Sequence, residues 1–327
     1  MTGLRAHGGR IDLAASHYPT APRPWLDLST GINPRAWRAA AATDAALDVD
    51  MTRLPSPTAI AALEAAAAAM FGTSADRVVA LPGSEIGLRS LRHLGLPLPA
   101  RFVVPCYGTH ADAFPGATPI AREATGEIRS GTLLLANPNN PDGRRDRPRD
   151  LLEIARQGAW LVVDEAFADA ISETSVVPLL EPDDRAVVFR SFGKFFGLPG
   201  IRLGFMIAPP DQVASMRERL GSWPVSAHAV AYGIAAYRDT DWIDASRRDL
   251  PLRAARLDDV LRRYGTVHGD CPLFRVIASD DAPALFERLA HAGILTRPFD
   301  YAPRWLRVGL PGDDAAFERL ERALTNG

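Results

Sequence analysis

The sequence has almost no lysine. Of its 37 lysine and arginine residues, all but Lys194 are arginine. A composition rich in arginine and alanine accounts for this scarcity without any chemistry. It does not account for the place where the single lysine is kept, which is the glycine-rich segment SFGKFFGLPG, residues 191–200. Any reaction that needs a lysine side chain must therefore use residue 194.

Cysteine, net charge and long apolar runs are also scarce. Cys106 and Cys271 are far apart and have no metal-ligand spacing, so we expect reduced thiols in a cytoplasmic protein and no metal site. The formal net charge of -2 gives no electrostatic reason to expect nucleic acid as a partner. Charges, glycines and prolines interrupt every apolar run, and the first residues lack an apolar signal-peptide core, so no membrane association is expected.

Short apolar strands alternate with helices over the middle of the chain. This pattern is typical of an α/β fold in which helices cover both faces of a mostly parallel sheet. A helix is expected at 58–71, ended by Gly72, and further helical patterns run to His93 and over 148–157. The expected strands are 78–81, 102–105, 132–136, 160–166, 186–192 and 202–208.

The two ends of the chain differ from this middle part. Residues 1–35 contain prolines at 19, 22, 24 and 34, and we expect an irregular arm there. From residue 226 a long helical region is followed by strands at 274–279 and 305–310 and by helices at 282–292 and 313–325. The prediction is an arm at 1–35, a large domain at 36–225 and a smaller α+β domain at 226–327.

The segment around Lys194 lies between two expected strands. A lysine that forms an imine must lose its proton at working pH, which favours a partly desolvated, electropositive pocket. Arg202 supplies a permanent positive charge and Ser191 a hydroxyl, a combination that suits a phosphate group. Taken alone, a single lysine in such a segment is far more often a surface residue in a glycine-rich turn, and it is the other motifs that favour a chemical role.

Two polar motifs follow other expected strands. Asp164 ends the apolar run of VVDEAF (162–167), where a carboxylate is costly unless it is paired. Asn140, in NPNNPDG (137–143), offers an amide donor within a tight turn. Their ordinary structural interpretations are a cap on the following turn and turn chemistry.

Two further motifs come earlier in the chain. Gly83 and Ser84, in LPGSEIGL (81–88), stand between a strand and a helix, where backbone N–H groups bind anions, although such a pair is often only a helix cap. Tyr107, in VPCYGTH (104–110), follows a strand, and its ring suits stacking on a planar ligand or ordinary core packing. Most of these motifs fall at carboxyl ends of strands, the edge at which open α/β sheets bind ligands.

In this order the motifs resemble those of pyridoxal-phosphate (PLP) enzymes of fold type I, the class I/II aminotransferase superfamily, over about residues 5–325. The chain is more closely similar to the threonine-phosphate decarboxylase family of cobalamin biosynthesis. The segments that carry this likeness are HGGRI (7–11), LDLSTGINP (26–34), DEAFAD (164–169), RSFGKFFGLPGIRLGF (190–205) and WPVSAHA (223–229).

The resemblance implies a role for each candidate residue. Lys194 would carry PLP covalently, Asp164 would pair with the ring nitrogen, Asn140 would contact the ring hydroxyl and Tyr107 would stack on the ring. The residues implied to hold the cofactor phosphate are Gly83, Ser84, Ser191 and Arg202. Those implied to bind substrate are Arg307, for its carboxylate, together with His7, Gly8, Asn33 and Arg297.

Two positions depart from the superfamily pattern. Leu54 stands where a tyrosine often reaches the cofactor phosphate of a neighbouring subunit, and Phe167 stands where histidinol-phosphate aminotransferases usually have tyrosine. Phenylalanine at this position is also found in the decarboxylase branch that the chain resembles. The resemblance thus implies a homodimer that decarboxylates O-phospho-L-threonine to (R)-1-aminopropan-2-yl phosphate. The alternatives are an aminotransferase for histidinol phosphate or a related amine, and a binding protein without turnover.

Overall fold

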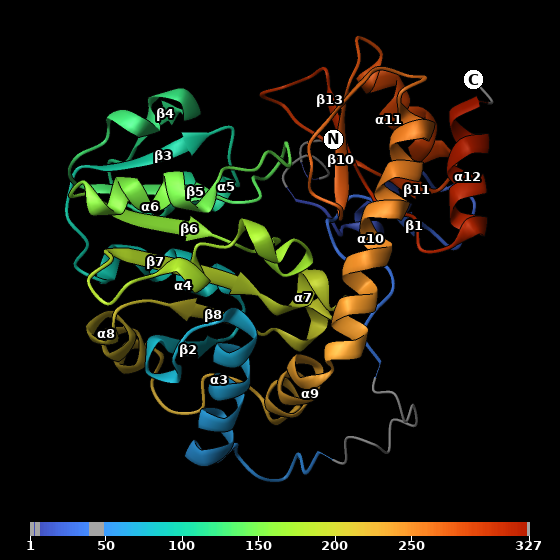
Figure 1. The fold of residues 1–327 in the computed structure, drawn as a ribbon. Helices are drawn as coiled ribbons and strands as arrows, with labels where there is room; N and C mark the ends of the chain where they lie inside the picture. Colours follow the sequence, from blue (N-terminus) through green and yellow to red (C-terminus); the bar gives the residue numbers. More distant parts are fainter. Residues whose placement is uncertain (1–2, 4–6, 39–48, 326–327) are drawn as a thin grey trace. The chain divides into compact units, whose positions relative to one another are not determined.

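A seven-stranded β-sheet forms the centre of the larger of two units in the computed structural model, which describes residues 3, 7–38 and 49–325. The strand order is β2-β8-β7-β6-β5-β3-β4, and neighbours are parallel except where β8 is involved (Figure 1). The predicted α/β class with a mostly parallel sheet is therefore confirmed. The strands are β2 (Val78–Leu81), β3 (Ala100–Val104), β4 (Thr118–Ala121), β5 (Thr132–Ala136), β6 (Trp160–Asp164), β7 (Ala186–Ser191) and β8 (Gly204–Ile207).

Local signals in the sequence explain where the helices of this unit begin and end. In α3 (Pro57–Phe71), the side chain of Ser56 accepts a hydrogen bond from Ala59 N at 3.1 Å, and Gly72 ends the helix with a φ of 73°. The other helices in or entering this unit are α4 (Ser84–Ser90), α5 (Gly108–Asp112), α6 (Pro148–Arg156), α7 (Phe192–Phe195), α8 (Pro210–Leu220), α9 (Ala227–Arg238) and α10 (Thr240–Leu261).

The apolar strands of this sheet are buried on both faces. On one face, side chains of α4 and α8 join a core that includes Val162, Val187 and Phe189. On the other face Phe71 of α3 packs edge-on against Phe205 of β8 and against Tyr237 of α9, with ring centroids 5.6 and 5.5 Å apart. Burial on both faces fixes the strands firmly, so their carboxyl ends form a rigid edge for side chains.

The smaller unit has its own antiparallel sheet. Its strand order is β12-β13-β10-β9, with α11 (Ala282–His291) and α12 (Asp314–Thr325) as its helices. These strands are β9 (Thr266–His268), β10 (Phe274–Ala278), β12 (Arg297–Pro298) and β13 (Trp305–Gly309). The expected strands and helices of the C-terminal α+β part are thus present.

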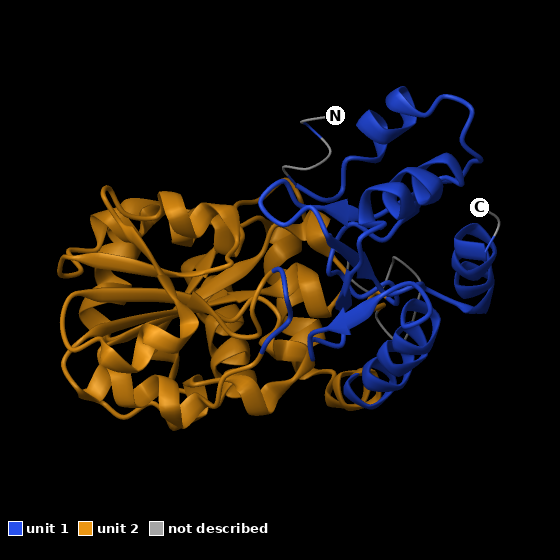
Figure 2. Ribbon diagram, turned by 90° about the horizontal axis from the view of Figure 1, so that it is seen from above, with its two compact units in different colours: residues 1–35, 141–144, 247–327 blue, residues 36–140, 145–246 orange. Residues whose placement is uncertain are grey.

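Figure 2 colours the two units separately. The smaller comprises residues 1–35, 141–144 and 247–327, and the larger comprises 36–140 and 145–246. Residues 1–35 therefore group with the C-terminal part, and the chain passes from the larger to the smaller unit within α10. The predicted boundary at 225/226 concerns folding domains and stays a prediction.

The expectation that residues 1–35 lack regular structure was wrong. This segment contains the short helix α2 (Ile11–His17) and the strand β1 (Leu26–Asp27), which pairs in parallel with β11 (Ile294–Leu295). The helix lies between Arg10 and Tyr18, ahead of the first of the prolines that dominate the composition of the segment. β1 gains its hydrogen-bond partners from residues almost 270 positions later, a pairing that local sequence does not reveal.

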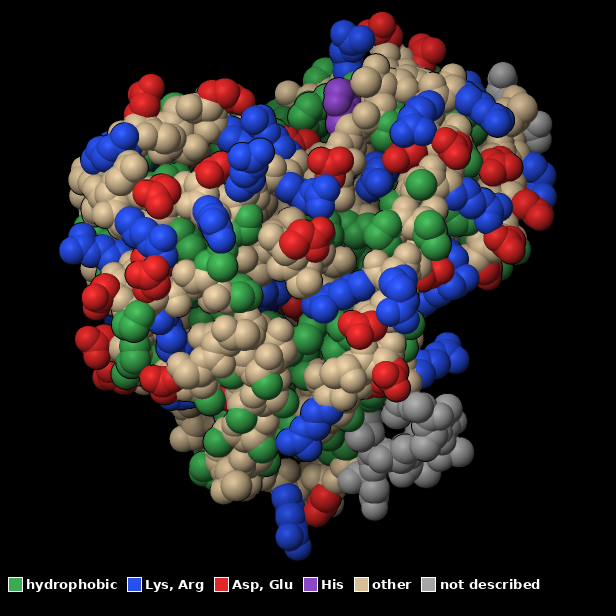
Figure 3. Space-filling model, viewed as in Figure 1, with side chains coloured by type: hydrophobic (Ala, Val, Ile, Leu, Met, Phe, Trp, Pro, Cys, Tyr) green, Lys and Arg blue, Asp and Glu red, His purple; other side chains and the backbone are tan. Residues whose placement is uncertain are grey.

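The visible surface of the protein carries charges of both signs (Figure 3). Figure 3 shows Lys and Arg side chains interspersed with Asp and Glu over the visible face. Among the described residues, no helix combines the length and apolar character needed to cross a bilayer. Within the same part of the chain, no group of three or more His, Cys, Asp or Glu side chains is arranged to hold a metal ion.

Candidate active site

Asp164 lies at the carboxyl end of β6 and is almost completely buried. Its Oδ2 atom is 3.0 Å from Nε2 of His110 in α5, and its Oδ1 atom accepts a hydrogen bond from Ala166 N at 3.1 Å. A buried carboxylate needs such partners because it has lost its water. The role of His110, the last residue of the VPCYGTH motif, was not predicted from the sequence. The available signal was its place three residues after Tyr107, which directly precedes α5.

His110 also has one unused nitrogen. It is fully buried, and no hydrogen-bond partner for its Nδ1 atom exists among the described residues. An imidazole held by a carboxylate on one nitrogen has a fixed ring orientation. His110 therefore fixes the direction in which Asp164 presents its carboxylate.

Lys194 lies in α7, the single turn that starts where β7 ends. Its Nζ atom is 5.9 Å from the centre of the Phe167 ring, and the lysine itself is half-buried. Phe167 follows Asp164 in the same turn and is buried. The segment after β6 thus contributes both the carboxylate and a ring that faces the lysine.

The four residues predicted to hold a phosphate lie at or near the ends of the neighbouring strands β7, β8 and β2. Ser191 ends β7 and pairs in register with Gly204 of β8, which in turn pairs with Leu81 of β2, two residues before Gly83. Gly83 has a φ of 91°, and a Cβ atom there would lie 2.7 Å from Nη2 of Arg202. Only glycine fits at this point, and its absence of a side chain lets the arginine approach the backbone.

Arg202 itself adopts an unusual backbone conformation. Its φ is 56°, in the left-handed region that residues with a side chain seldom occupy. Such a conformation costs about 1 kcal/mol or more and is common where function fixes a side chain. The chain thus holds a guanidinium against Gly83, next to Ser84 at the start of α4.

Tyr107 precedes His110 in the chain, and Asn140 lies between His110 and Asp164. Tyr107 directly precedes α5, with its ring 6.0 Å from that of His110, and burial followed by the nearby Glu85 carboxylate raises the pKa of its hydroxyl. Asn140 is half-buried in the turn after β5. The structure therefore brings these two predicted residues to the same sheet edge as Asp164 and Lys194.

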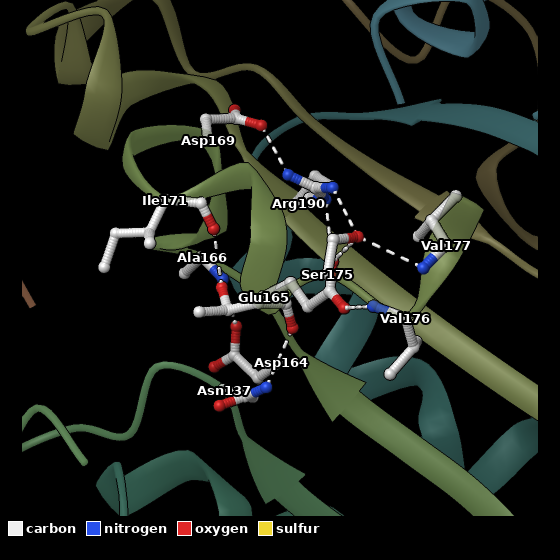
Figure 4. A network of polar contacts seen from close by, with 11 residues as sticks. Asn137, Asp164, Glu165, Ala166, Asp169, Ile171, Ser175, Val176, Val177 and Arg190 are labelled. Carbon is white, nitrogen blue, oxygen red and sulfur yellow. Dashed lines mark hydrogen bonds and ion pairs between the residues drawn. The ribbon is translucent and has the colours of Figure 1, made fainter. Parts of the chain in front are cut away.

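Asn137 holds the turn that carries Asn140. Its side-chain amide donates to the carbonyls of Asp146 and Thr174 at 3.1 and 2.8 Å, and its Oδ1 atom accepts from Asp146 N at 2.9 Å. Its backbone N–H donates to the Asp164 carbonyl at 3.0 Å, a contact visible in Figure 4. Sequence reasoning missed this role, because the partners lie up to 37 residues away.

The predicted substrate residues belong to the smaller unit. Arg307 of β13 stands directly opposite Arg297 of β12 in the sheet register. Burial, followed by the charge of Arg297, lowers the pKa of Arg307 to about 9. Like charges at directly opposed positions destabilise a sheet. A bound anion would relieve this repulsion, so the pair is suited to a negatively charged ligand.

Ser29 joins the N-terminal segment to Arg307. Its carbonyl accepts a hydrogen bond from Arg307 Nη2 at 2.9 Å, and its Oγ atom accepts one from Gly9 N at 2.8 Å. Asp27 in turn accepts hydrogen bonds from the N–H and the hydroxyl of Ser29. A Cβ atom on Gly8 would lie 2.4 Å from the Ser29 carbonyl oxygen, so residue 8 must be glycine for this approach.

The other two predicted substrate residues of the N-terminal segment, Asn33 and His7, differ in their exposure to solvent. Asn33 is buried, and its Oδ1 atom accepts a hydrogen bond from Arg35 N at 3.0 Å. His7 is exposed. The roles of Ser29 and Asp27 were not predicted, although both stand inside the LDLSTGINP motif that carried the resemblance.

Comparison with known proteins identifies the family. The model of class I and II aminotransferases matches residues 89–324. The chain belongs to the class I and II aminotransferase family. It is 38% identical over 329 residues to a threonine-phosphate decarboxylase of Pseudomonas aeruginosa, covering 97% of this chain and 96% of that protein. It is 39% identical over 336 residues to a threonine-phosphate decarboxylase of a Sinorhizobium species, covering 99% and 98%.

A solved structure supports the fold independently. The crystal structure of histidinol-phosphate aminotransferase from Sinorhizobium meliloti, in complex with pyridoxal-5'-phosphate, superimposes with a TM-score of 0.83 at 20% identity. The match covers 96% of this chain and 93% of that one. The fold-type I class predicted from the motifs is confirmed by this likeness.

Proposed function

We propose that this protein is a PLP-dependent carboxy-lyase that converts O-phospho-L-threonine to (R)-1-aminopropan-2-yl phosphate and CO2. The observation that carries the proposal is the likeness to two threonine-phosphate decarboxylases over nearly the whole chain. The resemblance to enzymes of cobalamin biosynthesis supports that pathway as its setting, and the cytoplasm as its location.

The residues of the larger unit fit PLP. The cofactor is a planar ring with a phosphate, an aldehyde, a hydroxyl and a basic nitrogen. The Arg202 guanidinium lies so close to Gly83 that a Cβ atom there would clash with it, and this arginine beside a bare backbone suits a phosphate. The buried Asp164 carboxylate suits a protonated ring nitrogen. Lys194, as the only lysine, is the candidate for the covalent link. Ser84 and Ser191 would add hydroxyls to the phosphate, Asn140 would donate to the ring hydroxyl and Tyr107 would stack on the ring.

In the reaction, PLP when bound supplies an electron sink for the pair left at Cα as the Cα–carboxylate bond breaks. Asp164 holds the proton on the ring nitrogen, because its negative charge stabilises the protonated form. His110 keeps that carboxylate in one orientation. Once its amine is free of the cofactor and protonated, Lys194 would deliver from Nζ the proton that replaces CO2 at Cα, which balances the loss of the carboxylate.

The residues of the smaller unit recognise the substrate. Arg307 offers a planar fork that matches a carboxylate with two parallel hydrogen bonds. The phosphate of phosphothreonine needs a second positive or N–H-rich site. Arg297, His7, Asn33 and the Gly8 backbone are proposed to form it, and Ser29 links Gly9 to Arg307.

The alternative is an aminotransferase for histidinol phosphate, the activity of the structurally similar S. meliloti protein. A transaminase breaks the Cα–H bond and needs a keto acid to complete its cycle. We expect CO2 and an amino-alcohol phosphate from phosphothreonine and PLP without any keto acid. Turnover of histidinol phosphate only in the presence of a keto acid, with no CO2 from phosphothreonine, would support the alternative instead.

We further propose that the protein is a homodimer. Leu54 and Trp223 are 64% and 53% exposed, and the neighbouring residues 55, 57, 60 and 224 line a cavity of about 510 Å³ together with Trp223. Large exposed apolar side chains beside a cavity are typical of a protein interface. The proposed occupant is a second copy, in line with the resemblance.

A further inference from the structure

A buried ionic network lies directly behind the cofactor residues of the larger unit. Glu165, Arg190 and Asp169 form its charged part, and all three side chains are almost completely buried. Arg190 reaches Glu165 at 3.0 Å and Asp169 at 2.5 Å, and it donates to Ser175 Oγ at 2.8 Å. Figure 4 shows Arg190 between Asp169 and Ser175, with Glu165 beside Ser175.

Glu165 also ties the loop after β6 to the segment that follows it. Its Oε1 atom accepts a hydrogen bond from Val176 N, and its Oε2 atom accepts one from Ser175 Oγ, both at 2.7 Å. Its backbone N–H donates to the Phe189 carbonyl of β7 at 2.9 Å. One glutamate thus connects three parts of the chain.

The network and the cofactor residues occupy opposite faces of the sheet. Successive side chains of an extended strand point to opposite faces. Asp164 meets His110 of α5, whereas Arg190 lies 4.7 Å from the Phe71 ring of α3. The network therefore does not compete for the ligand space, and its residues act through the backbone.

Each end of the network is adjacent in sequence to a proposed cofactor residue. Glu165 follows Asp164, and Arg190 precedes Ser191 and lies four residues before Lys194. Asp169 closes the turn that contains Phe167. The network thus fixes the carboxyl end of β6 and the carboxyl end of β7 to each other at the edge where the cofactor would bind.

The network has an excess of buried negative charge, so its contribution to folding stability alone does not explain it. It contains two carboxylates and one guanidinium, and burial raises the pKa of the Glu165 carboxyl. Replacing buried ion networks by apolar residues of similar volume is often neutral or stabilising. Their retention is better explained where a fixed geometry is needed, and a proton-transfer site is such a place.

We propose that Glu165, Arg190 and Asp169 are positioning residues that set the placement of Asp164 relative to Lys194. This inference rests on the proposed function only in taking Lys194 as the covalent anchor of PLP. The network would act on the geometry of the loaded protein before any substrate binds. Its effect is therefore measurable in the resting protein.

The test compares the holoenzyme with the variants Glu165→Gln and Arg190→Lys. Glutamine keeps the size of the side chain and an acceptor for Val176 N but loses the charge that holds Arg190. Lysine keeps one cation but lacks the planar fork that donates to Asp169 and Ser175 while it pairs with the charge of Glu165. The readout is the visible circular dichroism of lysine-bound PLP, which depends on a fixed asymmetric orientation. Asp164→Asn serves as the reference for a directly altered site.

Asp184→Asn is the matched control. Asp184 is a buried carboxylate paired with Arg156 at 3.1 Å, and it lies just before β7, at the opposite end of the strand from Arg190. We expect Glu165→Gln and Arg190→Lys to weaken or shift the circular-dichroism band and to lower kcat about 10- to 100-fold with little change in KM. Asp184→Asn is expected to lower thermal stability while leaving the band and kcat near those of the wild type.

Two results would overturn the inference. The first is a wild-type band and kcat in both network variants despite lower thermal stability. The second is failure of Glu165→Gln, Arg190→Lys and Asp169→Asn all to fold while Asp184→Asn folds, which would assign a purely structural role. If the wild type binds PLP but releases no CO2 from phosphothreonine, the proposed substrate fails, whereas the circular-dichroism comparison still decides the positioning role.

Discussion

Lys194 has no substitute within the chain. Because every other basic side chain of the lysine–arginine class is an arginine, a variant without Lys194 retains no side-chain amine. We expect Lys194→Ala to lose covalent attachment of PLP and about 10⁴-fold or more in turnover, at the upper end of what a positioned proton donor contributes. Borohydride reduction followed by peptide mapping locates the pyridoxyl group.

The same mapping experiment contains its own control, because the N-terminal amine is the remaining primary amine. Wild-type protein is expected to carry the label on the peptide that includes residue 194, and Lys194→Arg is expected to carry none there. Recovery of the label on the N-terminus of active wild-type protein would remove Lys194 from its proposed role.

Arg307 makes ligand binding sensitive to alkaline pH. Since its pKa is lowered to about 9, the guanidinium of the free protein is charged below this pH and loses its proton above it. A carboxylate binds the charged form, so affinity should be constant below pH 9 and fall about tenfold per pH unit above it. The unliganded fold should gain stability as the pH rises from about 9 towards the value of an unfolded arginine, because the unfolded chain then binds the additional proton.

Calorimetric titration with 3-phosphonopropionate from pH 7 to 10 measures this dependence. The compound has a carboxylate and a phosphonate but no amine. The second ionisation of its phosphonate falls near the start of this pH range and is the same for every protein variant, so the change due to Arg307 is taken from the comparison of wild type with Arg297→Gln. Arg297→Gln removes the neighbouring cation and is expected to move the midpoint upwards. An affinity that stays constant to pH 10 in wild-type protein would show that Arg307 does not bind the carboxylate or remains charged.

At the level of elements, the sequence predicted those that carry their own periodicity. The six expected strands of the large sheet correspond to β2, β3, β5, β6, β7 and β8, because strands buried on both faces of a sheet appear as continuous apolar runs. β4 was missed because its TPIA sequence is largely exposed at the sheet edge. The strands β1, β11 and β12 have two residues each, too few for a pattern.

The candidate site divides in a similar way between local and long-range information. Asp164 and Lys194 stand directly after apolar strands, and this local signal made them visible. Ser29 and Asn137 act through hydrogen bonds to residues 278 and 37 positions away, respectively. The local sequence around a serine or an asparagine in a turn does not indicate such distant partners, so these roles could be recognised only in the folded structure.

The N-terminal segment is an element with a testable role in specificity. Gly9 and Arg307 both bond to Ser29, which places the glycine-rich backbone beside the proposed carboxylate site within the smaller unit. If His7 contributes to a phosphate site there, His7→Ala should cost about 2–5 kcal/mol with phosphothreonine and much less with threonine. The measurement is kcat/KM for both substrates.

His17→Ala is the control for the arm, because His17 is another exposed histidine at the end of α2. It should leave the preference for the phosphorylated substrate unchanged. Equal losses on both substrates in His7→Ala would indicate a structural role for the arm and a phosphate site elsewhere.

For the molecule as a whole, Leu54 and Trp223 are exposed apolar residues that lie at or next to one cavity, which distinguishes them from an exposed leucine such as Leu252. Hydrophobic side chains that border a cavity are stabilised when a partner removes them from water, by about 25 cal/mol per Å² of apolar area. We expect wild-type protein to sediment as a homodimer at micromolar concentration. Leu54→Asp, which would bury a charge in that interface, should shift the protein towards monomer and lower its activity.

Leu252→Asp provides the matched control for the dimer prediction. Leu252 is 72% exposed on α10 and does not line the cavity beside Leu54. The same substitution there adds the same charge to an exposed leucine, and the protein should remain dimeric and active. An active wild-type monomer would contradict the proposed dimer outright. A Leu54→Asp variant that stays dimeric would instead show that copies associate through another surface, because an aspartate removed from water without a partner is too costly to leave an interface intact.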